Sequence, residues 1–405
     1  MKAHGPNEIL DVVSLFREQS AACAGELVAL RRDLHRHPEL SFQEERTAAV
    51  VASRLEALGF AVRRGVGGTG VVGLLEGSAP GPVAALRADM DALPVQEETG
   101  LPFASSVPGR MHACGHDLHT TCVLGAAMLL TSVRHLLKGT VLVLFEPAEE
   151  LNQGAAAMIR DGALTSPKPD MIFGLHNHPE YPVGSIAVKE GPLMAAVDTL
   201  RLHIRGKGGH GALPHRDRDP IVAAASVIMN LQTLVSRETD PLAAAVVSFG
   251  TITGGTANNV IPDTVELTGT VRSFSPEVRA ALAEGIRRVA GHTTAALGCT
   301  SDVTLRHDLP PVLNHPEATH LVRESALALS GPNAVVVPTP SMGGEDFALF
   351  QEQIPGCFFW LGVGNPDLGA IHPWHSPLFR ADETSLPLGA SVLALAAWKA
   401  LEKSV

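Results

Sequence analysis

Residues 140–147, TVLVLFEP, join an uninterrupted apolar run to an acidic end, and this pattern decides the predicted fold. Short runs of this kind are typical of strands buried on both faces of a sheet. Similar stretches occur on either side along the chain, PVAALRADM at 82–90 and DMIFGLHNHP at 170–179, while LHTTCVLGAAMLLTSV at 118–133 has the pattern of an amphipathic helix. Alternation of strand and helix predicts an α/β domain with a mostly parallel sheet and helices on both faces.

The pattern outside these strands indicates a second domain. The chain has 405 residues, and 45% of them are hydrophobic. A chain of this length is too long to fold around one ordinary core, so two domains are expected. Residues 26–60 predict two helices interrupted at His37-Pro38, and GCFFWLGVG at 356–364 predicts a late strand of the first domain.

The middle of the chain predicts a small inserted domain. Its segments follow the order β-α-β-β-α-β, which is a split βαβ unit of the ferredoxin-like kind. The segments are 197–206, 219–237, 243–255, 263–275, 276–298 and 300–308. We therefore expect a catalytic domain formed by residues 1–193 and 310–405, and an inserted lid domain formed by residues 194–309.

The amino-acid composition limits the classes of binding partner and the cellular location that we expect for the protein. The net charge is −11 without a local basic patch, and aromatic residues make up only 4%. These values argue against nucleic acid and favour a small or zwitterionic substrate. We expect no membrane span, since no apolar run reaches about 18 residues. The first residues lack a secretory signal pattern, and five scattered cysteines form no disulfide framework, so the expected location is the cytoplasm.

The stretch MHACGHDLHT at 111–120 is the first candidate for chemistry. Cys114 and His116 are two residues apart, so in an extended segment they would project to the same side. Thiolate and imidazole together suit zinc best. The alternative is a polar loop that caps the following helix, and we assign His112 and His119 to that structural role.

A pair of acids follows the strand at 140–146. Glu149 and Glu150 are adjacent in FEPAEEL, which is typical of a solvated loop or of the first turn of a helix. The functional alternative gives them two tasks: one carboxylate ligates a metal ion, and its neighbour acts as a general base on water.

Two histidine pairs occur late in the two parts of the first domain. His176 and His178 lie at the end of the strand predicted at 170–179, and His372 and His375 bracket Pro-Trp in GAIHPWHSPLF. From the residues alone, either member of each pair could be the ligand.

Asp89 and Asp91, in RADMDALP, share one side at a strand end and suit carboxylates that orient ligand histidines. Four of these clusters follow predicted strands directly. Because ligands of open α/β sheets bind at the carboxyl ends of the strands, the clusters predict one shared site.

The inserted domain adds a further set of candidates. His210 lies between glycines in GKGGHGALPH, which is otherwise typical of a turn. Asn259 is a turn former by default, and Arg272 is expected in the middle of a strand, where a guanidinium suits a carboxylate ligand. Gly344 belongs to a tight turn in SMGGEDFALF.

Together these motifs resemble a known family. The chain is similar to the aminoacylase/carboxypeptidase-type co-catalytic metallopeptidases, and within them to the amidohydrolase branch of hippurate hydrolases, N-acyl-amino-acid amidohydrolases and indole-3-acetyl-amino-acid hydrolases. The resemblance extends from residue 34 to residue 379, and the matching stretches are LHRHPELSFQE, LRADMDALP, MHACGHDLHT, FEPAEE, GLHNHP, GKGGHGALPH, NVIPD, TVRSF, GGEDFA and HSPLF.

The resemblance implies a site with two divalent metal ions. Zinc is the first choice, and manganese, cobalt or nickel are the alternatives. It implies the metal ligands Cys114, His116, Glu150, His176 and His375. It also implies Glu149 as general base and acid, with Asp91 in the same catalytic group.

For the inserted domain, the resemblance implies that His210 stabilises the oxyanion, often from a partner subunit, so a homodimer through this domain or a higher oligomer is expected. Arg272 and Asn259 are implied contacts of the substrate carboxylate, with Gly344 beside them. One departure is His178, where many relatives carry an aromatic or apolar residue.

The activity implied is hydrolysis of the amide bond of an N-acyl-amino acid, hippurate-like, to a carboxylic acid and a free amino acid. The alternatives are a dipeptidase or carboxypeptidase on the same scaffold, or a non-catalytic metal-binding protein. Against the last, a closed structural metal site gives Glu149 no role. A nucleotide-binding protein is disfavoured because no glycine fingerprint follows the first strand.

Overall fold

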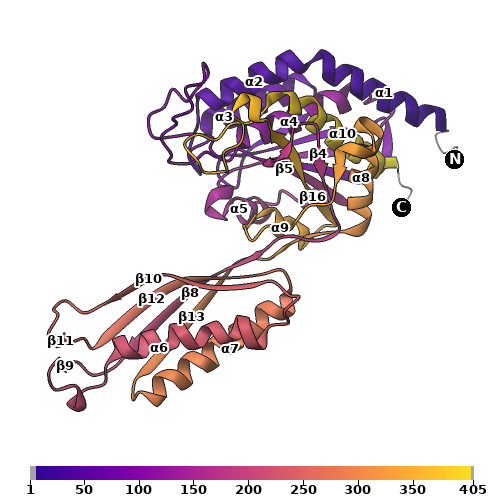
Figure 1. Ribbon diagram of the computed structural model, residues 1–405. Helices are drawn as coiled ribbons and strands as arrows, with labels where there is room; N and C mark the ends of the chain where they lie inside the picture. Colours follow the sequence, from indigo (N-terminus) through magenta and orange to yellow (C-terminus); the bar gives the residue numbers. More distant parts are fainter. Residues whose placement is uncertain (1–5, 403–405) are drawn as a thin grey trace. The chain divides into compact units, whose positions relative to one another are not determined.

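The computed structural model describes the backbone of residues 6–402 and the side chains from residue 12 to residue 402 (Figure 1). The chain divides into two compact units. The first consists of the residues up to Gly191, Leu313–Thr339 and the residues from Asp346 onward, and the second consists of Pro192–Val312 and Pro340–Glu345.

The first unit is built on an eight-stranded sheet. Its strand order is β1-β2-β4-β3-β5-β16-β6-β15. The central neighbours β4, β3, β5 and β16 run parallel, whereas β1, β2 and β4 are antiparallel neighbours. The strands are β1 (Ala61–Val66), β2 (Gly70–Glu76), β3 (Ala79–Asp89), β4 (Lys138–Glu146), β5 (Met171–Pro182), β6 (Ile186–Ala187), β15 (Val335–Val336) and β16 (Gly356–Gly364).

This sheet is mixed, so the predicted mostly parallel sheet is correct only for its centre. The strands predicted at 82–90, 140–147, 170–179 and 356–364 are β3, β4, β5 and β16. The antiparallel hairpin of β1 and β2 was not predicted: β1, AVRRGV, is mostly exposed and has no apolar run, and the buried apolar run of β2, GVVGLLE, was not assigned to a strand.

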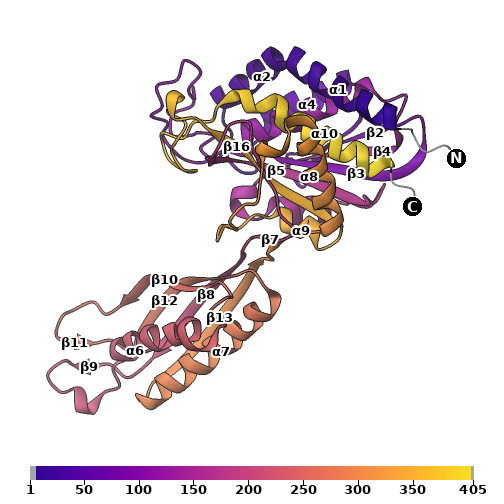
Figure 2. The same cartoon turned by 45° about the vertical axis from the view of Figure 1, so that its right-hand side comes forward.

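Helices cover both faces of the sheet, as Figures 1 and 2 show. Because side chains alternate along a strand, Phe173 and Leu175 of β5 join the large core on one face, whereas Gly174 faces Phe347 on the other. The first face carries α1 (Pro6–Ala22), α2 (Ala24–Arg36), α3 (Glu45–Ala57), α4 (His116–Ser132), α8 (Pro316–Ser330) and α10 (Leu386–Glu402); the second carries α5 (Gly154–Arg160) and α9 (Phe347–Gln351).

The helices α4 and α10 form the centre of the first face. Both are buried around nearly their whole circumference, and they pack against each other and against β3. The segment Glu383–Glu402, which includes α10, is long and apolar enough to span a membrane, but 78% of its most apolar window is buried inside the protein. Such burial is typical of a core helix of a large α/β domain.

A buried ion pair joins α2 to the start of α4. The Arg31 Nε atom lies 2.8 Å from Asp117 Oδ2, and His35 Nδ1 lies 2.8 Å from the same oxygen. Burial would raise the pKa of Asp117, but Arg31 and His35 hold it well below its usual range. The charged carboxylate therefore stabilises the fold next to His116.

We expect Asp117→Asn to lower the free energy of unfolding by about 3 kcal/mol at neutral pH, because it leaves the buried Arg31 guanidinium without its main counter-ion. Since the folded-state pKa of Asp117 is depressed, its contribution is complete above the unfolded pKa of about 4 and is lost as the pH falls through the folded value. Denaturant titrations of both proteins at several pH values measure the difference.

The partly exposed Asp33, whose carboxylate pairs with Arg46, supplies the matched control. Asp33→Asn should change the free energy of unfolding by no more than about 0.5 kcal/mol. Equal effects of the two substitutions would show that burial of the Asp117 pair contributes nothing.

The second unit contains a four-stranded antiparallel sheet of order β10-β12-β8-β13. Along the chain its main elements are β8 (Ala196–Arg205), α6 (Pro220–Thr233), β10 (Ala245–Gly254), β12 (Thr264–Ser273), α7 (Pro276–Ala296) and β13 (Thr300–Leu309). The helices α6 and α7 cover one face of this sheet and enclose a separate core (Figure 1). The two helices begin at Asp219-Pro220 and Ser275-Pro276, where the Asp219 and Ser275 side chains accept hydrogen bonds from Ile221 N and Val278 N.

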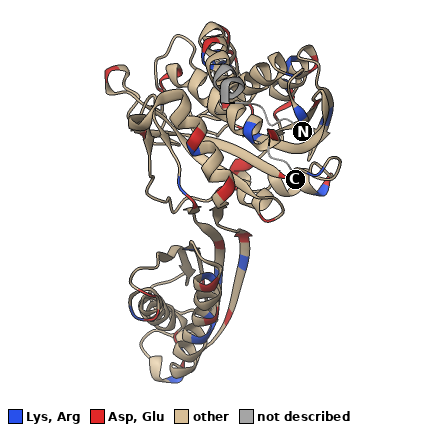
Figure 3. Cartoon of the chain, turned by 90° about the vertical axis from the view of Figure 1, so that its right-hand side faces the viewer, with Lys and Arg blue, Asp and Glu red and all other residues tan. Residues whose placement is uncertain are grey.

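Shorter elements complete the two units. A two-stranded sheet pairs β9 (Gly209–His210) with β11 (Val260–Ile261), and β7 (Gly191–Met194) pairs with β14 (Val312–Asn314). Positions of Lys and Arg are scattered among those of Asp and Glu in both units (Figure 3).

The limits of the second unit differ slightly from the predicted domain of residues 194–309. The unit begins at Pro192 and its main segment ends at Val312. The short segment Pro340–Glu345 also belongs to it, and nothing in the local sequence pattern indicated that assignment.

Candidate metal centre

The Cys114–His116 segment owes its shape to a glycine. Gly115 has a φ angle of 85° and precedes the first residue of α4, His116. A Cβ atom at Gly115 would lie 2.4 Å from Asn177 Nδ2, so this position requires glycine for both conformation and space. The predicted extended segment is therefore wrong: Cys114 lies in a bend, and His116 opens the helix that was predicted to begin at 118.

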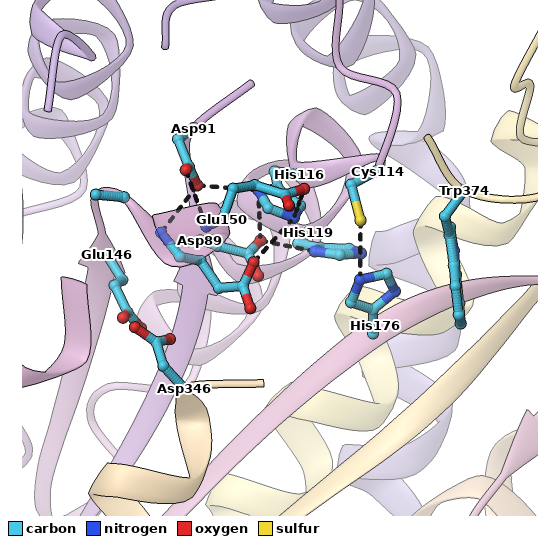
Figure 4. Close-up of polar contacts among 12 residues, drawn as sticks. Asp89, Asp91, Cys114, His116, His119, Glu146, Glu150, His176, Asp346 and Trp374 are labelled. Atoms are coloured by element: carbon cyan, nitrogen blue, oxygen red, sulfur yellow. Dashed lines mark hydrogen bonds and ion pairs between the residues drawn. The ribbon is translucent and has the colours of Figure 1, made fainter. Parts of the chain in front are cut away.

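The strand β5 brings His176 to this bend. The Cys114 Sγ atom lies 3.4 Å from His176 Nε2, and Figure 4 shows the two side chains facing each other. The indole of Trp374 borders His176, with ring centroids 4.8 Å apart, and its Nε1 atom lies 3.2 Å from Asn177 O. His176 thus contacts the Cys114 thiol and the indole ring of Trp374.

The two acids lie on a single turn of 3₁₀ helix after β4, Glu149–Leu151. The His116 Nε2 atom lies 3.9 Å from Glu149 Oε2 and 3.8 Å from Glu150 Oε1. His375 reaches Glu150 from a distant loop, with 3.5 Å between Nε2 and Oε1. The backbone of His375 has a φ angle of 64° and its amide donates to Ala113 O, so the loop is held in an uncommon conformation.

The structure thus brings all five predicted ligands and Glu149 together. Within each of three groups, the candidate ligand atoms lie within 4.8 Å of one another. The groups are Cys114, His116 and His176; Cys114, Glu150 and His375; and His116, Glu149 and Glu150. Two groups share Cys114. His178 and His372 are in no such group among residues 12–402.

Several observations show that a cation fits this site. The His116 Nε2 and Glu150 Oε1 atoms are buried and make no hydrogen bond within the described part of the chain, although they face each other. Burial alone would lower the pKa of His116, but Asp89, Asp91 and Glu150 raise it to about 10. The surroundings of His116 therefore stabilise positive charge, which a divalent ion would supply.

The donor atoms also have suitable chemistry. Burial lowers the pKa of His176 well below its usual value, so its imidazole is neutral and able to ligate. Burial, together with Glu150 and Glu149, raises the pKa of the Cys114 thiol well above its usual value. The thiolate that binds metal is therefore favoured only when a cation is present.

Buried carboxylates orient the histidines: Asp91 contacts the predicted ligand His116, whereas Asp89 is bonded to His119, which is not among the predicted ligands. His116 Nδ1 lies 3.2 Å from Asp91 Oδ1, and His119 Nδ1 lies 2.7 Å from Asp89 Oδ1. The His119 Nε2 atom accepts a hydrogen bond of 2.9 Å from Asn177 N; His119 lies buried within α4, not in the capping loop expected for it. These contacts fix the rings around the bend.

The buried Arg87 contacts Asp89 and two further carboxylates. Arg87 donates from Nη1 to Asp89 Oδ2 at 2.8 Å, from Nε to Glu146 Oε2 at 2.6 Å and from Nη2 to Asp346 Oδ1 at 3.1 Å. Glu146 and Asp346 lie on the side of Asp89 away from Cys114 and His176 in Figure 4. Burial would raise the pKa of Asp89, but His116, His119 and Arg87 hold it well below its usual range. Asp89 therefore remains charged beside His119.

The candidates of the second unit form two local pairs. Val260 of β11 pairs with His210 of β9, and the backbone of Asn259 accepts a hydrogen bond of 2.8 Å from Gly211 N. Arg272 lies one residue before the end of β12, not in its middle, and a Cβ atom on Gly344 would lie 3.5 Å from its Nη1 atom. Burial lowers the pKa of Arg272, against Asp308 and Asp198, which raise it.

Sequence reasoning missed several residues of the metal centre. Asn177 donates 2.6 Å to Cys114 O and contacts His119, and Trp374 covers His176. Glu44 and Ser41 support the acidic turn and Asp91. The only available signal was that these residues lie inside or beside the quoted motifs, which give no partner for any of them.

Comparison with known proteins gives the family. The profile of peptidase family M20/M25/M40 matches residues 85–399. The N-acetylcysteine deacetylase of Bacillus subtilis (strain 168) is 45% identical over 373 residues, covering 91% of this chain and 95% of the relative. The IAA-amino acid hydrolase ILR1-like 2 of Arabidopsis thaliana is 41% identical over 372 residues, covering 91% of this chain and 83% of the relative.

A solved structure agrees with these relatives. The YXEP protein of Bacillus subtilis, described as a dinuclear metal binding peptidase from the M20 family, matches with a TM-score of 0.84 and 43% identity, covering 94% of this chain and 99% of that chain. The resemblance found in the sequence motifs is thereby confirmed. The chain is a hydrolase of peptidase family M20/M25/M40.

Proposed function

We propose that this hydrolase cleaves the amide bond of N-acyl-amino acids, releasing a carboxylic acid and a free amino acid. The observation that carries the proposal is the convergence of Cys114, three histidines and the Glu149–Glu150 pair at one site. The relatives named N-acetylcysteine deacetylase and IAA-amino acid hydrolase support the substrate class.

The same proposal assigns the metal ligands. Two divalent ions would be held by the five side chains named in the sequence resemblance, Cys114, His116, Glu150, His176 and His375. When bound, the ions would polarise the substrate carbonyl and lower the pKa of water. Zinc is our first choice because thiolate and imidazole donors suit it, with manganese, cobalt and nickel as alternatives.

Glu149 is the proposed general base and acid. Its carboxylate lies beside His116, and its amide donates to Asp91 at 3.2 Å, which fixes the turn that carries it. Glu149 would take a proton from the attacking water and return it to the nitrogen of the leaving amino acid. Asp91 would act through this amide and through His116.

We further propose that the second unit is a ferredoxin-like lid that binds the rest of the substrate. Its strand order and its two helices on one face support this assignment. In the proposal Arg272 grips the free carboxylate beside Gly344, Asn259 contacts the same group, and His210 stabilises the oxyanion. The half-buried guanidinium of Arg272 donates from Nε to Thr270 Oγ1 at 2.9 Å, and in the proposal its two outer nitrogens bind the ligand carboxylate.

We expect Arg272→Ala to raise KM for an N-acyl-amino acid roughly 10- to 100-fold with little change in kcat, because a hydrogen-bonded charge pair is lost from both ground and transition states. Steady-state kinetics measure both constants. The exposed Arg201 on β8 is the matched control, and Arg201→Ala should leave KM unchanged. A fall in kcat at constant KM would contradict a binding role for Arg272.

The alternative activity is that of a dipeptidase or carboxypeptidase on the same scaffold. A panel of N-acetyl-amino acids, N-benzoyl-amino acids and free dipeptides, assayed on protein of known metal content, separates the two. We expect the N-acylated compounds to be hydrolysed with the higher kcat/KM. Faster hydrolysis of free dipeptides would reject the proposed substrate class, and no hydrolysis by metal-loaded protein would favour a non-catalytic metal-binding protein.

Assembly and location complete the proposal. We propose a homodimer, or a higher oligomer, formed through the second unit, since α6 exposes Ile221, Val222 and Met229, the last 70% exposed, and β10 ends its sheet. Light scattering after gel filtration measures the mass in solution. We also propose a cytoplasmic location, with neither nucleic acid nor membrane as a partner, in keeping with the net charge of −11.

A further inference from the structure

The turn that carries Glu149 and Glu150 begins with a residue in an unfavourable backbone conformation. Ala148 has φ and ψ angles of 52° and 39°, which is the left-handed region, and it is fully buried. A residue with a Cβ atom disfavours this region, so the surrounding structure must hold Ala148 in place. The direction of the next residue, Glu149, depends on it.

Three consecutive amides of this turn donate to two buried carboxylates. Ala148 N donates to Glu44 Oε1 at 2.9 Å, Glu149 N donates to Asp91 Oδ1 at 3.2 Å, and Glu150 N donates to Asp91 Oδ2 at 3.1 Å. The role of Asp91 follows from the motif that contains it. Glu44 is the second carboxylate, and it lies 104 residues away from Ala148 in the chain.

Glu44 is directed at the turn and at its own loop. It is the residue before α3, but its side chain makes no cap hydrogen bond to that helix. Instead Oε1 also accepts from Phe42 N at 3.0 Å, and Oε2 accepts from Thr69 Oγ1. The carboxylate is completely buried, and a buried anion is retained only where its hydrogen bonds repay its desolvation.

The loop before Glu44 supports both carboxylates. Ser41 Oγ donates to Asp91 Oδ2 at 2.7 Å, while the amide of Phe42 donates to Glu44. The segment Ser41–Glu44 therefore connects the carboxylates of Asp91 and Glu44, which accept the hydrogen bonds of the acidic turn.

We propose that Glu44 is a positioning residue of the hydrolase, which holds Ala148 in the left-handed conformation and so aims the carboxylate of Glu149. This inference rests on the proposed function, in which Glu149 is the base. In this proposal Glu44 acts through the amide of Ala148, not by contact with the substrate.

The first test is Glu44→Ala. We expect kcat for an N-acyl-amino acid to fall roughly 10- to 100-fold, because small displacements of a catalytic group have effects of that size. KM and the metal content measured by elemental analysis should stay close to those of the unchanged protein. An unchanged kcat, or a loss of metal that accounts for the loss of kcat, would overturn the proposal.

Two further variants separate positioning from general stability. Glu44→Gln keeps an acceptor for the Ala148 amide and should retain most of kcat. Ala148→Gly removes the steric penalty of the left-handed conformation, so it should restore part of kcat when combined with Glu44→Ala and change little alone. Absence of rescue together with a low kcat for Glu44→Gln would reject the role assigned to the Ala148 amide.

Matched controls complete the experiment. The neighbouring Glu45 is exposed, so Glu45→Ala should leave kcat unchanged. If Glu44→Ala does not fold, Thr69→Val tests the fixation of the same carboxylate, since it removes only the hydroxyl bonded to Glu44 Oε2. It should lower kcat in the same direction without loss of metal. An unchanged kcat in a folded Thr69→Val protein would then count against the proposal.

The parent protein and Glu149→Gln identify which idea fails. If the parent hydrolyses N-acyl-amino acids, Glu149→Gln is inactive and Glu44→Ala is fully active, only the positioning role is wrong. If Glu149→Gln remains active, the proposed function is wrong in its assignment of Glu149 as the general base.

Discussion

Replacing Glu149 by glutamine should leave a folded, metal-containing protein with kcat lower by roughly 10²- to 10⁴-fold, the range that general acid–base catalysis supplies. The substitution keeps the size of the side chain and removes its ability to accept and return a proton. Glu149 lies at the same turn as Glu150 but has a separate task in the proposal, so loss of turnover should occur without loss of metal.

The measurement pairs kcat with elemental analysis of the same sample. The exposed Glu180 on β5 is a matched control, and Glu180→Gln should have the activity of the unchanged protein. Retained turnover in Glu149→Gln would reject the assignment of the base. Parallel loss of metal and activity would instead make Glu149 a ligand.

Removal of metal is the second change with a large expected effect. After chelation and dialysis, hydrolysis of N-acyl-amino acids should fall below detection, and it should return when zinc or manganese is added. The metal-free protein should also unfold at a lower temperature, because an ion that binds only the folded state stabilises it by mass action.

Metal binding to the chelated protein should release protons. The pKa of Cys114 is raised well above its usual value by burial and by Glu150 and Glu149, and that of His116 is raised to about 10 by Asp89, Asp91 and Glu150 against the effect of burial. Both groups therefore hold a proton at neutral pH without a cation and must lose it to ligate. The affinity for metal should consequently rise with pH.

Calorimetric titration in buffers of different ionisation enthalpy counts these protons. Cys114→Ser should bind metal more weakly, whereas Cys23→Ser, which changes a half-buried thiol in no candidate group, should bind it normally. Full activity in the thoroughly chelated protein would contradict the metal-dependent reaction, and binding without proton release would contradict the role of the thiol.

The fold was predictable where burial of an element gives its sequence a recognisable apolar pattern. The strands β3, β4, β5 and β16 are short apolar runs because helices cover both of their faces, and they were located from the sequence. The hairpin of β1 and β2 was missed because the mostly exposed edge strand β1 has no apolar run, and the apolar run of β2 does not by itself reveal a partner. Its pairing with β2 depends on tertiary contact, which no local pattern records.

The candidate site was predictable where residue type alone limits the chemistry. Cysteine, histidine and paired glutamates after strands pointed to a metal centre, and the described structure brings these residues together. The choice of His176 over His178, and of His375 over His372, came only from family resemblance. The supporting contacts of Asn177 and Glu44 could not be predicted, because each depends on backbone groups distant in sequence.

The segment Pro340–Glu345 has a practical consequence for engineering. Gly344 fits against Val197 and Leu309, so residues 192–312 transplanted by themselves into a related scaffold would meet a foreign loop at this place. A chimaera that exchanges this module between relatives must exchange two segments, the long insert and the six-residue loop, and therefore needs four crossover points. Libraries that exchange only the long insert would be expected to yield mismatched hybrids.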